Sequence, residues 1–292
     1  MGNITAGMVK ELRERTGLGM MDCKKALTAA DGDMDKAIDD LRKASGIKAA
    51  KKASRVAAEG VVLTKTAEDG NYGVVIEVNS ETDFAARDNN FLDFAQQALE
   101  LAYSHSEADV AGLLDAGLED MRSALVQKIG ENCNVRRVER FQFAGEEAGV
   151  VESYVHSNNK IAVLISVTGG DEALARDVAM HIAAVNPLVI KAEDVPEEEI
   201  AKEKEIYSAQ ARESGKPEEI IEKMISGRLR KFVAEVSLLE QPFVKDPDVT
   251  VGKLLKDADA SVVQFTRFEV GEGIEKEEVD FADEVAAQVK GS

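Results

Sequence analysis

The sequence contains no tryptophan, and aromatic residues occupy only 5% of its 292 positions. Its two cysteines, Cys23 and Cys133, lie far apart and form no Cys-x-x-Cys motif, so we expect buried free thiols and neither a zinc site nor a disulfide framework. No apolar run approaches the roughly 18 residues of a membrane-spanning helix, and the N-terminus shows no signal-peptide pattern. We therefore expect a soluble, cytoplasmic protein that does not contact membranes.

The motifs that hold nucleotides or carry out common reactions are also missing. There is no Gly-x-x-x-x-Gly-Lys-[Ser/Thr] loop, and Gly271-Glu-Gly273 lacks the third glycine of a dinucleotide fingerprint. No His-Glu-x-x-His or Gly-x-Ser-x-Gly sequence appears. The 55 acidic residues are numerous enough that chance carboxylate pairs are certain, so they define no acid–base site. We predict a protein that is not an enzyme and has no catalytic residues, no metal ligands and no cofactor.

Charge is abundant but uneven. The net charge is −19, yet residues 1–55 carry twelve Lys or Arg against eight Asp or Glu, which leaves −23 for residues 56–292. Such an acidic body repels nucleic acid and suits either a basic partner surface or solubility alone. Residues 42–55 differ, with six basic residues and no acidic one. This segment could be an exposed linker, a helix extension or a nucleic-acid patch, although no aromatics interleave for base stacking.

Hydrophobic spacing predicts three short helices between residues 5 and 45. Gly17 and Gly19 separate the first two, and Asp31-Gly-Asp33 separates the second from the third, with Asp33 as the expected N-cap. Three helices of about ten residues each make a small binding module with no room for a catalytic cleft. We expect residues 1–55 to hold this module and its linker.

An internal duplication is visible between residues 56 and 190. The segment Glu59-Gly-Val-Val62 recurs as Ala148-Gly-Val-Val151, and the β-forming run 73–78 recurs as 161–167 at near-equal spacing. Each copy then continues into a helical pattern. A strand, a hairpin partner and a helix cannot bury their own apolar face, but two such units side by side can.

The predicted fold class is therefore α+β, with a duplicated core of two subdomains, residues 56–145 and residues 146–194 joined by 232–275. Residues 195–231 predict two charged amphipathic helices about a turn at Ser214-Gly-Lys-Pro217, which form a protruding antiparallel hairpin. We expect β character to return at Phe232 and to include a strand at 262–270 that could pair with the core. Residues 276–292 predict a C-terminal helical module, either packed or in contact with a partner.

A polar connection between residues 79 and 91 contains Thr82-Asp83-Phe84, an aromatic beside a carboxylate. A β-forming run, Tyr72 to Val78, precedes it, and a helical pattern begins at Phe91. In one interpretation Phe84 folds back as a staple on that helix while Asp83 caps its N-terminus. In the other, the connection presents Phe84 to a partner, as loops on rigid scaffolds often do.

Thr82-Asp83-Phe84, with Glu-Val-Asn at 77–79, resembles the signature of the elongation factor Ts family. This family more often has Val where the sequence has Ala85. The resemblance implies a guanine-nucleotide exchange factor for the GTPase elongation factor Tu, with a ubiquitin-associated-like module at the N-terminus. It extends in order over nearly the whole chain through Lys10-Glu-Leu-Arg-Glu-Arg-Thr-Gly, Met20-Met-Asp-Cys-Lys-Lys-Ala-Leu, Lys128-Ile-Gly-Glu-Asn and Arg267-Phe-Glu-Val-Gly-Glu-Gly.

The resemblance also implies which residues contact the partner. Thr82, Asp83 and Phe84 would disturb the partner's Mg²⁺ site. The other implied contact residues would add binding energy elsewhere on the partner. The residues alone leave plainer alternatives: a solvated lysine at 24, a helix stop with a core Ile129, and a polar loop residue at His156. The implied contacts are Lys24, Thr82, Asp83, Phe84, Ile129, Gly130 and His156.

The expected partner is elongation factor Tu, without direct nucleic-acid contact, and a homodimer or a 2:2 complex with the partner is left open. Two other functions compete with this one. An RNA- or ribosome-associated protein would use the basic segment 42–55, and a metal-dependent hydrolase would use the carboxylates.

Overall fold

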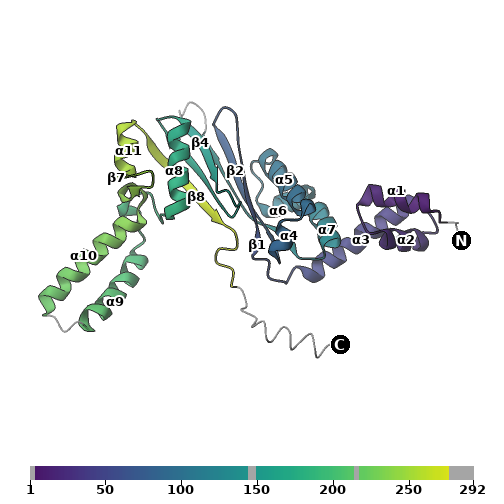
Figure 1. Ribbon diagram of the computed structural model, residues 1–292, viewed down its shortest axis with the longest axis horizontal. Coiled ribbons are helices and arrows are strands. Elements are labelled where there is room, and N and C mark those ends of the chain that lie inside the picture. The colour runs from purple at the N-terminus through teal and green to yellow at the C-terminus, as the bar shows by residue number, and fades with distance from the viewer. Residues whose placement is uncertain (1–3, 144–148, 214–216, 276–292) are drawn as a thin grey trace.

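The computed structural model describes residues 4–143, 149–213 and 217–275 (Figure 1). Three helices form the N-terminal module: α1 (Ala6–Thr16), α2 (Met20–Ala29) and α3 (Met34–Lys52). Asp33 caps α3 as predicted, because its carboxylate accepts a hydrogen bond of 3.0 Å from the backbone N–H of Lys36. The module has its own apolar core, whose fully buried members are Leu12, Cys23, Leu27 and Ala37.

The third helix is longer than the predicted ten residues. It runs for 19 residues to Lys52, so most of the basic segment 42–55 is helical, in agreement with the helix-extension alternative. The physical reason is tertiary: Ala49, near the end of α3, is fully buried in the core of the neighbouring sheet domain. The helix therefore connects the module to the core. Its other faces expose the basic side chains of Arg42, Lys43, Lys48 and Lys51.

The first half of the core is a three-stranded antiparallel sheet with helices on one face. Its strands, β1 (Glu59–Thr66), β2 (Tyr72–Ser80) and β3 (Cys133–Gln142), lie in the order β1-β2-β3. Helices α5 (Asn89–Ser104) and α7 (Glu119–Ile129) cover the sheet. The apolar layer between them is continuous and includes Val74, Ile76, Val78, Phe91, Phe94, Leu99 and Val126.

The second half repeats this arrangement. Strands β4 (Gly149–Val155), β5 (Ile161–Thr168) and β8 (Ser261–Glu269) form a sheet of order β4-β5-β8, and α8 (Glu172–Val185) covers it. In both sheets the register between the central strand and the third strand shifts at one point. The shift falls between Glu77 and Val78 in β2 and between Ser166 and Val167 in β5, which supports the predicted duplication.

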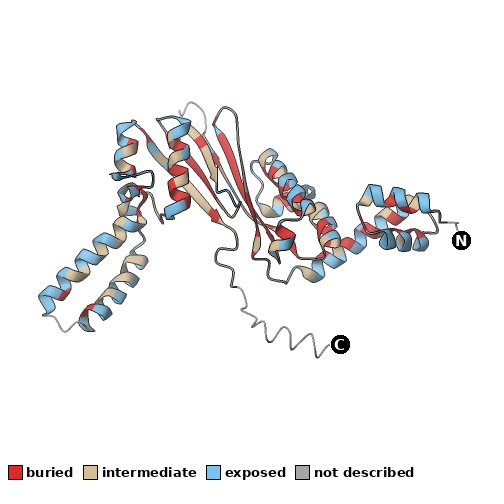
Figure 2. Cartoon of the chain, viewed as in Figure 1, coloured by how far each residue is buried: buried red, intermediate tan, exposed pale blue. Residues whose placement is uncertain are grey.

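The two sheets pack face to face, so the core has four layers with helices outside and sheets inside (Figure 1). Side chains alternate along each central strand: Val75 and Leu164 point into the interface, while their neighbours point to the helices. The backbones approach closely at Gly73, where a Cβ atom would lie 2.7 Å from a Val151 methyl group. Burial on both faces makes every residue of β2 inaccessible, as the red strand in Figure 2 shows. The α+β fold class is therefore confirmed.

The connection between α5 and β3 is helical but interrupted. Helix α6 (Val110–Leu113) passes into a wide turn, η1 (Leu114–Leu118), before α7 begins. The cause is Gly117, whose φ of 110° lies outside the helical region and is a conformation that side chains disfavour.

The helical hairpin consists of α9 (Glu197–Glu213) and α10 (Glu218–Val236), and it protrudes from the core (Figure 1). The predicted return to β character begins later than Phe232, because α10 continues to Val236 and the first strand after it starts at Pro242. Helix α10 begins one residue after Pro217. A parallel bridge between Val189 and Ser237 closes the base of the hairpin.

Short elements then complete the second half, and β8 pairs with β5 as expected. The predicted C-terminal helical module, residues 276–292, lies outside the described residues. None of the helices that the structure describes has the length and apolar content to cross a membrane. The short elements are η2 (Ala192–Asp194), η3 (Leu238–Glu240), β6 (Pro242–Phe243), β7 (Asp246–Thr250) and α11 (Val251–Asp257).

One carboxylate, Glu77, lies fully buried at the edge of the interface between the sheets. It accepts hydrogen bonds from Arg136 (3.2 Å), Arg137 (2.5 Å), the Asn79 side chain (2.9 Å) and the backbone N–H of Gly271 (2.8 Å). Burial opposes ionisation, but the Gly271 amide, Asn79 and Arg137 together hold the pKa of the Glu77 carboxyl below its usual value. Glu77 thereby ties the first sheet to the chain that follows β8.

We expect Glu77→Gln to lower the free energy of unfolding at pH 7 by about 2–4 kcal/mol, because Arg136 and Arg137 lose their anionic partner. The contribution of Glu77 is present above its unfolded-state pKa of 4.5 and is lost as the pH falls through the lower folded-state value. The difference in the free energy of unfolding between variant and wild type should therefore become smaller at acidic pH. Urea unfolding at several pH values measures this, with Glu139→Gln on the exposed side of β3 as control. An equal loss in both variants would contradict the role of Glu77.

Candidate partner-binding site

Thr82-Asp83-Phe84 forms the start of a short helix, α4 (Asp83–Ala86), directly after β2. Thr82 is its N-cap, since the hydroxyl accepts a hydrogen bond of 3.2 Å from the backbone N–H of Ala85. Ala85 and Ala86 are buried against the core, so the opposite side of α4 faces outward. Phe84 lies on that side with 81% of its surface exposed.

The staple interpretation of Phe84 is wrong. The N-cap of α5 is Asp88, whose carboxylate accepts from the backbone N–H of Asn90 at 2.8 Å, and Asp83 does not take this role. Asp83 instead forms an exposed ion pair of 2.9 Å with Arg87. The departure at Ala85 falls on the packed side of α4, so it leaves the exposed Asp83-Phe84 pair unchanged.

Ile129 and Gly130 lie at the C-terminal end of α7, as the sequence predicts. Gly130 adopts a left-handed conformation (φ 85°), and its N–H donates to the Val126 carbonyl at 2.9 Å. Its own carbonyl accepts a hydrogen bond from the ammonium group of Lys52 at the end of α3. Ile129 is partly buried against the core, whereas Gly130 is exposed.

Two carboxylates that the sequence analysis did not single out connect these segments. Glu131 accepts hydrogen bonds from both the backbone N–H (3.0 Å) and the hydroxyl (2.7 Å) of Thr82. In the opposite direction, Glu81 accepts from the backbone N–H of Asn132 at 2.6 Å. The only signal in the sequence is that each glutamate adjoins a predicted contact residue.

His156 occupies the turn between β4 and β5 and is exposed, with its Nδ1 atom 3.3 Å from the Tyr154 hydroxyl. This turn lies beside the start of β1. The backbone N–H of Val62 donates to the Asn159 carbonyl at 2.9 Å, and the Lys160 ammonium reaches the Glu59 carboxylate at 3.0 Å.

Strand pairing brings these three segments to one end of the core. Ser80, which precedes the Thr82 turn, pairs with Glu59 on one side and with Cys133 on the other. The His156 turn adjoins the first of these partners, and Gly130 closely precedes the second. Thr82 to Phe84, Ile129 with Gly130, and His156 therefore share the end of the sheets where β1 begins and β2 ends.

Lys24 lies apart from this end, on α2 of the N-terminal module, where it is exposed. Met20 and Met21 on the same helix are also exposed. Because α3 runs from the module to the core, the module is attached to the same body as the other predicted contacts (Figure 1).

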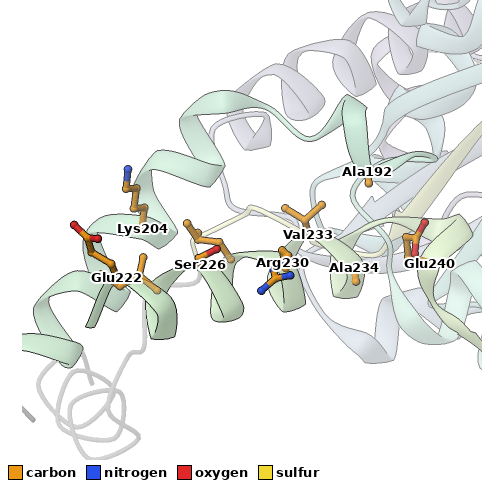
Figure 3. Close-up of a pocket in the computed structure, with 10 residues that line it drawn as sticks. Ala192, Lys204, Glu222, Ser226, Arg230, Val233, Ala234 and Glu240 are labelled. Atoms are coloured by element: carbon orange, nitrogen blue, oxygen red, sulfur yellow. The ribbon is translucent and has the colours of Figure 1, made fainter. Parts of the chain in front are cut away.

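A groove of about 770 Å³ opens elsewhere, along the helical hairpin. Figure 3 shows its lining side chains along α10, from Glu222 to Ala234, with Lys204 on α9 and Ala192 and Glu240 near the base. It does not include any predicted contact residue.

No group of three or more His, Cys, Asp or Glu residues is placed to hold a metal ion within the part of the chain that the structure describes. Cys23 and Cys133 are free and buried, as predicted. Burial raises the pKa of the Cys133 thiol to about 12, so the thiol stays protonated and unreactive at neutral pH.

Comparison with known proteins identifies the class. The model of the family described as Elongation factor TS matches residues 81–272. Elongation factor Ts of Hahella chejuensis is 63% identical over 291 residues, with 100% of each chain covered. Elongation factor Ts of Teredinibacter turnerae is 62% identical over 99% of this chain and 98% of its own, and that of Cellvibrio japonicus is 56% identical over 100% and 99%.

These relatives are translation elongation factors that align along the full length of the chain. The chain belongs to the elongation factor Ts family.

The exposure of Phe84 predicts that its ring contributes little to stability. We expect Phe84→Ala to change the free energy of unfolding by less than about 0.5 kcal/mol, as is usual for an exposed side chain. The matched control is Phe91→Ala, seven positions later and fully buried in the core, which should lose about 3–5 kcal/mol. Urea denaturation compares the two. A loss in Phe84→Ala that approached the Phe91→Ala value would show that the ring packs inside the protein.

Proposed function

We propose that this protein is a guanine-nucleotide exchange factor that binds elongation factor Tu carrying GDP and promotes release of GDP in the cytoplasm. The observation that carries the proposal is the presentation of Phe84, an exposed aromatic ring on a capped and buried turn. A large apolar side chain held in water by a rigid support is typical of a group that enters a partner. The family to which the chain belongs supports this choice of partner.

The proposed mechanism is mechanical displacement at the partner's nucleotide site. A GTPase holds GDP through a phosphate-binding loop, and Mg²⁺ requires near-octahedral coordination by phosphate and protein oxygens. A ring that wedges between elements of that site moves ligands away from the metal, and both Mg²⁺ and GDP then bind less tightly. Asp83 can exchange its exposed ion pair with Arg87 for polar groups of the partner, because the pair is accessible to solvent.

Phe84 cannot supply all of the energy. Full burial of a Phe side chain contributes roughly 1.5–3 kcal/mol, and about 1.4 kcal/mol corresponds to a tenfold change in an equilibrium. We therefore assign further binding energy to Lys24, Ile129, Gly130 and His156. Three of these four lie at the same end of the sheets as Phe84, and Lys24 lies on the attached module.

Exchange then follows from thermodynamic linkage. If the factor binds the nucleotide-free partner more tightly than the GDP-bound partner, it must weaken GDP binding by the same ratio. Such a mechanism needs neither a nucleotide site nor catalytic chemistry in the factor itself.

We expect Phe84→Ala to slow stimulated GDP release from elongation factor Tu by about tenfold or more. The burial energy lost with the ring, roughly 1.5–3 kcal/mol, corresponds to at least a tenfold change. Release of a fluorescent GDP analogue from the loaded partner, timed after mixing with the full chain, measures the effect. Val244→Ala is the control, because Val244 is also an exposed apolar residue but lies on the β6–β7 turn of the second half. Stimulation by Phe84→Ala equal to that of wild type would contradict the wedge.

A further inference from the structure

We propose that Glu131 and Glu81 are positioning residues for exchange: they hold Phe84 at a fixed place relative to Gly130. The inference rests on the proposed function, because it gives these two carboxylates a role in that same site. Neither needs to touch the partner.

Glu131 holds the turn that carries Phe84. Its two carboxylate oxygens accept from the backbone N–H and from the hydroxyl of Thr82, at 3.0 and 2.7 Å. The same hydroxyl accepts from the Ala85 N–H at 3.2 Å, so donation to Glu131 also fixes the rotamer that caps α4. The position of the first turn of α4, and hence of Phe84, therefore depends on Glu131.

Glu81 makes the reciprocal connection. Its carboxylate accepts from the Asn132 N–H at 2.6 Å and lies 3.4 Å from the Arg55 guanidinium. The buried Asn132 side chain donates to the Arg55 carbonyl at 2.8 Å, which ties the segment after α7 to the chain that leaves α3. Each glutamate therefore reaches across to the segment that carries the other.

These polar contacts matter because α4 cannot hold its own orientation. It has only four residues, and a helix of this length is not stable by itself. Its buried side chains are the small ones of Ala85 and Ala86, while Phe84 points into solvent. The ring therefore takes its direction from the backbone. Two side chains outside α4 hold that backbone at Thr82: the buried Ser80 hydroxyl at the end of β2 donates to the Thr82 carbonyl at 3.0 Å, and the Glu131 carboxylate accepts from the Thr82 N–H.

The first arm of the test uses the free chain and no partner. In Glu131→Ala we expect the Thr82 amide hydrogen to exchange with solvent about tenfold faster or more, because it loses its acceptor. The Glu131→Gln variant, which keeps one acceptor oxygen, should lie between it and wild type. Glu139→Ala is the matched control, an exposed glutamate eight positions away, and should leave the Thr82 amide unchanged.

The second arm measures GDP release with Phe84 present and absent. We expect Glu131→Ala to slow stimulated release about fivefold or more in the wild-type background and to cause no further loss in the Phe84→Ala background. A residue that acts through Phe84 shows this non-additivity. A residue that only supports the general fold would lower release in both backgrounds.

The two arms separate failure of this inference from failure of the proposed function. An unchanged Thr82 amide in Glu131→Ala, or a full additional loss in the Phe84→Ala background, would overturn the positioning role. If the Phe84→Ala variant stimulated GDP release from the partner as well as wild type does, the proposed wedge role of Phe84 would be contradicted. The Thr82 amide would still decide whether Glu131 holds the turn: faster exchange would support that role and an unchanged rate would overturn it.

Discussion

The contact on which the rest of the structure depends is the face-to-face packing of the two sheets. Each central strand, β2 and β5, is covered by helices on one side and by the other sheet on the second side. Neither half could bury both faces of its central strand alone. Because the sheets are packed with their strand ends together, segments that belong to different repeats, such as the Thr82 turn and the His156 turn, reach the same end of the core.

The parts of the fold that the sequence predicts correctly are those set by local chemistry. Asp33 caps a helix because its side chain reaches the next turn, and Gly130 ends one because it adopts a left-handed conformation. The strands and their main helices follow from periodicity of two and of 3.6 residues. The errors arise where contacts between residues far apart in the sequence determine where an element ends. Ala49 is buried in the core at the end of the lengthened α3. The β-forming residues after Phe232 stay helical to Val236, whose carbonyl accepts from the backbone N–H of Leu188.

The candidate site divides in the same way. Resemblance identifies Thr82, Asp83 and Phe84, but the direction of the ring depends on which residue caps α5, and Asp83 and Asp88 are both suitable by type. The reciprocal hydrogen bonds of Glu131 and Glu81 could not be predicted. Glu131 and Thr82 are 49 positions apart in the sequence, and Glu81 and Asn132 are 51 apart. Strand pairing of β2 with β3 creates these neighbours, and no local pattern encodes it.

The parallel bridge at the base of the hairpin has a consequence for how this family can vary. In both repeats, further chain lies before the third strand. The segment between α5 and β3 contains α6, η1 and α7, and the segment between α8 and β8 contains the α9–α10 hairpin followed by β6, β7 and α11. Val189 and Ser237 place the two ends of the segment that contains the hairpin in direct contact. Chain enclosed between adjoining ends can lengthen or shorten at a small entropic cost. The hairpin is thus a modular insertion, and its length can change without altering the packing of the two sheets.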